Sequence, residues 1–187
     1  MVVRTLNPLS FIAQPLRLCV ESQYNLNHEE HSPWQMALLG RAMEARAGAG
    51  VGWIQVRVIS SFPPSLAIGL APTSMTAIDH HDRGLAGGGS WGGEGDVHWN
   101  LPGPAPASNT VKFGQGDRVM VVLDCRTEPL VRLLVNYRAC LIHHLTTSPT
   151  STPPIAVFYP AIALGAGSRV DLEPSAPLPD GWDATPT

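Results

Sequence analysis

The stretch FGQGDRVMVVLD, residues 113–124, is the most informative part of this chain of 187 residues. Two glycines flank Gln115, Asp117 follows, and the chain then becomes apolar. A glycine loop that cradles phosphate follows a strand and opens a helix, whose first N–H groups face the anion. Here the glycines precede a run rich in valine, and no Gly-Lys-Ser/Thr follows. The pattern therefore predicts a tight turn that feeds a central strand.

Further strand-like segments lie on both sides of this stretch. In residues 52–60, Ile54, Val56 and Val58 alternate with residues of the opposite face, as in a strand. We expect residues 52–60 and 66–71, joined by the turn FPPS, to form a hairpin. The other predicted strands lie at 9–20 (two strands, or one edge strand broken at Pro15), 97–99, 118–124, 130–136, 155–165 and 168–174. Strands about ten residues apart with turn-rich joins predict an all-β sandwich.

One segment carries a helix signature instead. Ser32-Pro33-Trp34-Gln35 resembles a capping box with proline at the first helical position, and residues 36–47 are mostly good helix formers. Gly48 would then end the helix. At the other end of the chain, residues 174–187 are rich in proline and predict a flexible tail.

Composition narrows the classes of function. The formal net charge is −3, charged residues make up 14% of the chain, and Lys112 is the only lysine. The sequence has no basic stripe, so binding to a nucleic acid is not expected. No apolar run approaches the ~18 residues of a spanning helix, and the N-terminal segment does not have the pattern of a signal peptide. We expect Cys19, Cys125 and Cys140 to be buried free thiols. These features predict an intracellular protein, most simply cytoplasmic with a nuclear location left open.

A second glycine-rich motif raises an enzymatic alternative. Residues 88–92, GGSWG, match the Gly-x-Ser-x-Gly nucleophile elbow, in which Ser90 would be the nucleophile of a small hydrolase. That elbow needs a strand before the serine and a helix after it. The following GGEGD is a poor helix former, so the residues argue against this alternative.

The histidines cluster along the chain and are candidate metal ligands. The clusters are His28 and His31, the loop sequence His80-His81-Asp82-Arg83, and His143-His144. Adjacent histidines on a strand point to opposite faces, and the first pair does not lie in a helical pattern. We therefore predict no metal site and no cofactor. Residues 72–90 form a long polar loop, and loops of this length in compact domains are often functional.

The aromatic residues have an expected structural role. Trp53, Trp91 and Trp99 lie in or near predicted strands and are expected in the core. Tyr137 and Tyr159 are expected to pack with the hydroxyl at the rim.

Seven segments, in the same order along residues 50–173, resemble the SPRY domain family, most closely its Ran-binding-protein-9-like and Ash2-like branches. They are Gly52-Trp53-Ile54-Gln55-Val56, Ile68-Gly69-Leu70-Ala71, Ser90-Trp91-Gly92, Phe113-Gly114-Gln115-Gly116-Asp117, Leu123-Asp124, Leu133-Leu134-Val135-Asn136 and Phe158-Tyr159-Pro160-Ala161. The resemblance implies a twisted sandwich of two antiparallel sheets with a concanavalin-like jelly-roll architecture. It also implies a strand, in place of the helix, at residues 36–43, with at most a helical turn at 32–35, since tertiary pairing overrides local propensity.

The resemblance further implies a non-catalytic module that holds a short segment of a partner protein through loops at one end of the sandwich. The partner-binding candidates carried over in this way are Thr73, Asp79, His80, His81, Arg83, Gly165, Ala166 and Gly167. The better-defined peptide-binding branch has Val-Trp-Gly at the second of these loops, and this chain has Gly-Ala-Gly. The peptide specificity of that branch is therefore not expected here.

The sequence thus predicts three parts: residues 1–35 as strands and a loop that pack on or extend the sandwich, 36–173 as the SPRY-like domain, and 174–187 as the tail. Two alternatives to a protein-binding adaptor or subunit stay open at this point. One is the hydrolase at Ser90. The other is a glycan-binding sandwich, which would need exposed aromatic platforms beside polar side chains on a sheet face.

Overall fold

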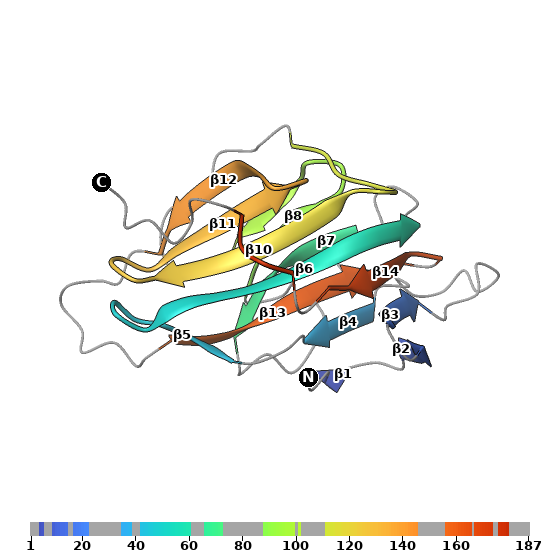
Figure 1. Ribbon diagram of the computed structural model, residues 1–187, viewed down its shortest axis with the longest axis horizontal. Coiled ribbons are helices and arrows are strands. Elements are labelled where there is room, and N and C mark those ends of the chain that lie inside the picture. Colours follow the sequence, from blue (N-terminus) through green and yellow to red (C-terminus); the bar gives the residue numbers. More distant parts are fainter. Residues whose placement is uncertain are drawn as a thin grey trace.

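The computed structural model describes residues 4–5, 9–14, 17–22, 35–38, 42–60, 66–72, 88–99, 101, 111–145, 156–165, 167–173 and 176–179. These residues form two antiparallel sheets packed in layers, with no helix among them (Figure 1). In particular, this part of the chain has no helix long and apolar enough to cross a membrane. The prediction of an all-β sandwich of two antiparallel sheets is confirmed.

Each sheet has seven strands, and we call the two layers sheet A and sheet B. Sheet A has the order β1 (Arg4–Thr5), β4 (Gln35–Leu38), β13 (Ala156–Leu164), β7 (Leu66–Pro72), β8 (Gly89–Gly92) and β9 (Val97–Trp99), and β5 (Met43–Ala45) also pairs with β13. Sheet B has the order β12 (Arg138–His144), β11 (Leu130–Val135), β10 (Arg118–Cys125), β6 (Gly50–Ser60), β14 (Arg169–Leu172), β3 (Arg17–Ser22) and β2 (Leu9–Gln14).

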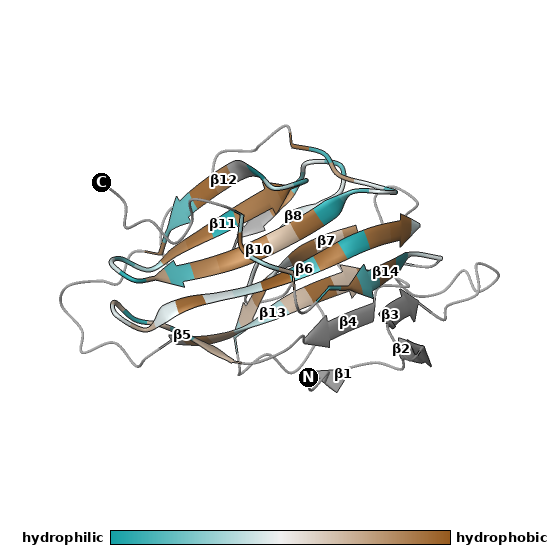
Figure 2. Ribbon diagram, viewed as in Figure 1, coloured by the Kyte–Doolittle hydropathy of each residue, from teal (hydrophilic) through white to brown (hydrophobic). Residues whose placement is uncertain are grey.

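The main core lies between the two sheets. In β6 the side chains of Ile54, Val56 and Val58 are buried in it, as their alternation predicts. The inward residues of β10 join them, and sheet A contributes apolar residues such as Ile68 and Ile162. Figure 2 shows this apolar character along the central strands of both layers. The hydrophobic effect of this shared core holds the two sheets together.

Strand β10 is buried on both faces, which explains its continuous apolar run. Its alternate residues Met120 and Val122 face away from the main core and form a second cluster with Leu134 of β11. Val51, Ala176 and Leu178 pack against this cluster. We call this side of sheet B its outer face. Residues 176–179, within the segment expected to be a flexible tail, therefore pack against the sheet.

The turn before β10 is structural, as its sequence predicts. The amide of Gly116, at a φ of 93°, donates to the Val58 carbonyl at 2.9 Å, and the Val58 amide donates to the Asp117 carbonyl at 2.8 Å. A positive φ of this size favours glycine. The Asp117 carboxylate accepts a hydrogen bond from the Gly114 amide at 2.9 Å. The glycines thus join the turn to β6, and no helix follows them that would present N–H groups to a phosphate.

The helix signature at residues 36–47 loses to strand pairing. Strands β4 and β5 both pair with β13, with Ala37 opposite Ile162 and Glu44 opposite Val157. The segment predicted as two strands or one broken strand, 9–20, forms two strands, β2 and β3, of which β3 pairs with β14. Residues 32–34, where a helical turn was expected, lie outside the described residues. Domain boundaries at 35 and 173 remain predictions.

The expected hairpin between residues 52–60 and 66–71 is wrong. β6 pairs with β10 and β14 in sheet B, whereas β7 pairs with β13 and β8 in sheet A. The connection at residues 61–65 therefore passes from one layer to the other. Each of these two strands is paired along both edges with strands that are distant in sequence. Such long-range pairing cannot be predicted from the local sequence. Strands β8 and β12 were also not predicted as strands.

The sandwich has two ends, which we name by a residue at each. At the Cys125 end, β5 and β7 finish, β6 and β13 begin, and the Gly48 amide donates to the Cys125 carbonyl at 2.6 Å. At the Gly116 end, β6 and β13 finish, and β7 and β10 begin. These ends fix where each connection between strands is anchored.

Candidate interaction surfaces

The structure describes only two of the eight residues predicted to bind a partner. Gly165 is buried and its carbonyl accepts a hydrogen bond from the Ser168 amide at 3.1 Å. Gly167 has a φ of 74°, and its carbonyl accepts a hydrogen bond from the Ser60 hydroxyl at 3.1 Å. These two glycines thus build the tight turn that takes the chain from sheet A to sheet B. Thr73, Asp79, His80, His81, Arg83 and Ala166 lie outside the described residues.

The two predicted loops start from opposite ends of the sandwich. Because β7 and β13 are antiparallel, Pro72 at the end of β7 lies opposite Phe158, near the start of β13. Leu164 at the end of β13 lies opposite Leu66. At ~3.3 Å per residue, the bases of the two loops are about 20 Å apart along the sheet. The expectation that both loops start from one end of the sandwich is therefore wrong. The order of strands along the sequence does not show at which end of the sandwich each strand finishes.

Two long connections of the chain are anchored at the Cys125 end. Residues 73–88 connect β7 to β8. These two strands pair with each other, and Leu70 lies opposite Gly89, so the connection both leaves and re-enters the sheet at this end. Residues 145–155 connect the end of β12 to the start of β13, also at this end. The short turns at 46–49 and 126–129 lie at the same end of the sandwich (Figure 1). Connections of this length on a rigid sandwich are typical positions for binding residues.

A charged cluster stabilises this end. The Asp124 carboxylate is buried and accepts a hydrogen bond from Arg126 Nη2 at 2.8 Å, and Arg132 Nη2 lies 3.5 Å from the same oxygen. The hydrogen bonds from Arg126 outweigh the effect of burial and hold the pKa of Asp124 below its usual value. Next to it, burial raises the pKa of the Cys125 thiol, which agrees with a buried free cysteine. Asp124 therefore fixes the turn after β10.

The outer face of sheet B carries the exposed large hydrophobic residues among those described. Trp53 is 39% exposed, Tyr137 45% and Ile142 53%. Trp53 is thus not in the core as expected, whereas Trp91 is. Across the strands, Trp53 lies opposite Val122, Val122 opposite Arg132, and Arg132 opposite Ile142. The outer face of β6, β10, β11 and β12, which carries this row of residues, is a second candidate interaction surface.

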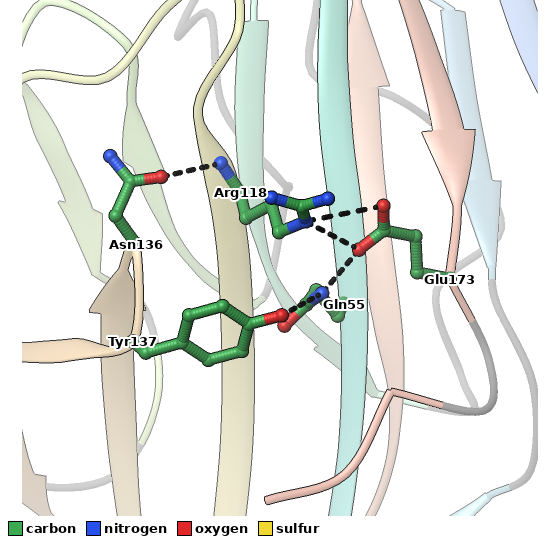
Figure 3. Close-up of polar contacts among 5 residues, drawn as sticks. All are labelled: Gln55, Arg118, Asn136, Tyr137 and Glu173. Atoms are coloured by element: carbon green, nitrogen blue, oxygen red, sulfur yellow. Dashed lines mark hydrogen bonds and ion pairs between the residues drawn. The ribbon is translucent and has the colours of Figure 1, made fainter. Parts of the chain in front are cut away.

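Tyr137 occupies a strained position in the hairpin between β11 and β12. Asn136 and Tyr137 have φ values of 51° and 65°, as in a two-residue turn that favours Asn-Gly. A bulky residue at positive φ is uncommon, and such positions often mark functional sites. The turn directs the Tyr137 ring over the outer face of sheet B (Figure 3). A glycine at this position would leave that side of the face without an aromatic ring.

A polar network continues from Tyr137 across the sheet (Figure 3). Gln55 Nε2 donates to the Tyr137 hydroxyl at 3.2 Å and also to the Glu173 carboxylate. Arg118 Nε lies 3.2 Å from the same carboxylate, which therefore has one amide donor and one cationic donor. The Glu173 amide donates to the Gln55 carbonyl at 2.9 Å. The network thus fixes Glu173, the last residue before the C-terminal segment turns onto the outer face.

The hydrolase alternative at Ser90 is contradicted by the strands around it. Ser90 is fully buried in β8, where it lies opposite Gly69 on one side and His98 on the other. The chain continues into β9, not into a helix. The strand–serine–helix geometry of a nucleophile elbow is therefore absent at this position.

The described histidines do not form a ligand set. His143 is buried, and burial together with the neighbouring His144 lowers its pKa. His144 is exposed, with Nδ1 3.8 Å from the Glu128 carboxylate. Within the described ranges, no three His, Cys, Asp or Glu residues come together as metal ligands. His28, His31, His80 and His81 lie outside these ranges.

Comparison with solved structures agrees with this architecture. No protein-family model and no curated protein match the sequence. The structure is similar to a human SPRY domain, with a TM-score of 0.59 and 13% identity over 92% of this chain and all of that chain. It is also similar to the SPRY domain of human HERC1, with a TM-score of 0.52 and 14% identity over 74% of this chain and 81% of the other.

A third similar structure is the carbohydrate recognition domain of Emp47p, with a TM-score of 0.54 and 10% identity over 91% of this chain and 85% of that chain. At these identities the likeness concerns the fold. The chain has a SPRY-like sandwich fold, as its sequence segments predict.

Proposed function

We propose that this chain is a non-catalytic protein-interaction module that holds a short segment of a partner protein at the Cys125 end. The observation that carries the proposal is that two long connections, 73–88 and 145–155, are both anchored at this end. Two described turns at the Gly116 end are hydrogen-bonded to the strands, through the Gly116–Val58 and Gly93–Leu66 amide–carbonyl pairs. The SPRY-like fold and the buried setting of Ser90 agree with binding in place of catalysis.

The binding residues proposed at this end are Thr73, Asp79, His80, His81 and Arg83. Their loop has both anchors at the Cys125 end, whereas Gly165 and Gly167 belong to a turn at the other end. Charged residues make up 14% of the chain, so an interface that is largely apolar, with a few polar contacts, fits better than one steered by charge.

The test is a charge reversal in the loop compared with a matched reversal at the opposite end. Arg83→Glu is expected to reduce capture of the partner from the chain's own cells at least ~10-fold, because losing a central arginine contact of an interface costs about 2 kcal/mol or more. Arg138→Glu changes an exposed arginine next to the 136–137 turn and should leave capture unchanged. Both variants should melt within about 2 °C of the parent chain, since surface changes rarely alter stability.

Equal capture by the parent chain and Arg83→Glu would remove the 73–83 loop from the binding surface. Loss of capture with Arg138→Glu alone would move the site to the Gly116 end.

Glycan binding is a second candidate function, and it rests on a different observation. Trp53 is exposed on the outer face of sheet B, two residues from the polar network of Gln55 and Glu173. Exposed aromatic rings next to polar groups are suited to sugar rings, and the carbohydrate recognition domain of Emp47p shares the sandwich architecture. Binding on a glycan array that Trp53→Ala abolishes would support this function over protein binding.

A further inference from the structure

The outer face of sheet B already holds a short peptide segment, which belongs to the chain itself. Residues 176–179 read Ala-Pro-Leu-Pro. The Ala176 carbonyl accepts a hydrogen bond from the Trp53 indole N–H at 2.9 Å. Ala176 and Leu178 pack against the apolar cluster of Met120, Val122 and Leu134. One hydrogen bond and two apolar side chains thus seat the segment on the face.

The sequence of this segment restricts its backbone. Proline fixes φ near −65°, and the residue before a proline is directed to extended conformations. In Ala-Pro-Leu-Pro, each residue is either a proline or precedes one. Such segments lose little conformational entropy on binding, and protein domains recognise them through surfaces lined by aromatic residues. Trp53, with its indole N–H directed at a backbone carbonyl, is a side chain of this kind.

The segment is tethered to the sheet at Glu173. Glu173 is anchored by Gln55 and Arg118, and the Ala176 amide donates to the Glu173 carbonyl at 3.1 Å. Beyond this point, the segment contacts Trp53 and the apolar cluster. One hydrogen bond and two apolar side chains stay in place because the chain at Glu173 keeps the segment close to the face. Another segment of the same chemistry can therefore replace it.

We infer that the outer face of sheet B is a docking site for a proline-containing apolar segment of a partner protein, and that residues 176–179 occupy it in cis. Met120, Val122 and Leu134 present apolar side chains to the occupant, which match leucine and alanine better than the hydroxyl groups of a sugar. The proposed site is separate from the Cys125 end. Failure of either proposal therefore leaves the other in place.

The experiment uses the full chain and a synthetic peptide, Ser-Ala-Pro-Leu-Pro-Asp, which repeats residues 175–180. In the parent chain the tethered segment competes with the peptide. In the Leu178→Asp chain, a carboxylate would have to be buried on the apolar cluster, so the segment leaves the face. We expect the peptide to bind the Leu178→Asp chain at least ~10-fold more tightly than the parent chain, because the tether gives the segment a high effective concentration.

The readout is the indole N–H resonance of Trp53, assigned with a Trp53→Phe chain. It should shift in Leu178→Asp and return toward its parent position on titration with peptide. The same peptide carrying the Leu178→Asp change is the control and should not restore it. Should Leu178→Asp not fold, Leu178→Ser removes the apolar contact with a smaller polar group and is tested in the same way.

Equal affinity of the peptide for the parent and variant chains, or no binding to either, would overturn the inference. A concentration-dependent dimer of the parent chain that Leu178→Asp abolishes would assign the face to a second copy and overturn it in its present form. Restoration of the Trp53 resonance by the parent peptide alone supports it.

Discussion

Asp124 shows how one residue links the core to the edge of the molecule. It is the last polar residue of β10, its side chain is buried, and Arg126 and Arg132 lie within ion-pair distance of its carboxylate. Arg126 comes from the turn after β10 and Arg132 from β11. The carboxylate therefore holds together the turn 126–129 and two strands at the Cys125 end.

Asp124→Asn is expected to destabilise the fold by about 1–3 kcal/mol at neutral pH, because both arginines lose a partly buried partner. The folded-state pKa of Asp124 lies below that of the unfolded chain. Its contribution is therefore complete above the ordinary aspartate pKa of about 3.9 and is lost as pH falls through the folded-state value. Urea unfolding of parent and variant at pH 7 and at acid pH should show the difference narrowing on acidification. A constant difference at all pH values would contradict this role.

Gly69 is required by the close approach of two strands. A Cβ at Gly69 of β7 would overlap the Gly89 carbonyl and the Ser90 Cα of β8, and these are backbone atoms that cannot move aside. Gly69→Ala should cost about 1–3 kcal/mol, the usual range for overpacking. Gly52→Ala is the matched control, because the atoms nearest to its added methyl belong to the flexible Met43 side chain. Chemical denaturation of both should give the larger loss for Gly69→Ala; equal losses would show that β8 adjusts freely.

At the scale of elements, the turn before β10 and the turn after β11 support each other. The Asp117 carboxylate accepts from the Gly114 amide and from Asn136 Nδ2, the latter at 2.8 Å. Asn136 Oδ1 in turn accepts from the Arg118 amide at 3.0 Å. These contacts join the start of β10 to the end of β11 at the Gly116 end.

A double-mutant cycle measures this link. Asp117→Ala is expected to cost about 1 kcal/mol or more, since it removes two hydrogen bonds. Asn136→Gly removes the amide while a glycine still adopts the positive φ at this position. The two changes together should cost less than their sum by about 0.5–1 kcal/mol, as for residues in contact. Strict additivity in urea unfolding would show that the Asp117–Asn136 contact contributes nothing.

The sequence predicts elements well where the pattern is local. The alternation in residues 52–60 and the apolar run in 118–124 identify β6 and β10, since both depend on the side chains of one segment. β8 escapes prediction because it is glycine-rich, and it is formed by pairing with β7 and β9. The helix signature at 36–47 fails for the same reason, since β13 supplies the pairing for β4 and β5.

At the scale of the whole molecule, the sequence predicts the sandwich but not which segments share an end. Because 52–60 and 66–71 were predicted to pair as a hairpin, the prediction missed that the chain crosses from one sheet to the other between them. It therefore also missed that β7 ends at the Cys125 end and β13 at the Gly116 end. Likewise, no local pattern shows that Trp53 lies beneath Ala176, since 123 positions separate them in sequence. Long-range placement of this kind is decided by sheet pairing and by burial.

Site-specific photo-crosslinking in the chain's own cells would show which end of the sandwich binds the partner. A photoreactive amino acid is placed at His81, in the proposed loop at the Cys125 end, or at Lys112, an exposed residue of the Gly116 end. If the partner binds at the Cys125 end, we expect a covalent adduct with one protein from position 81 and none from position 112. Adducts of equal yield from both positions, or an adduct from position 112 alone, would contradict the proposed binding end.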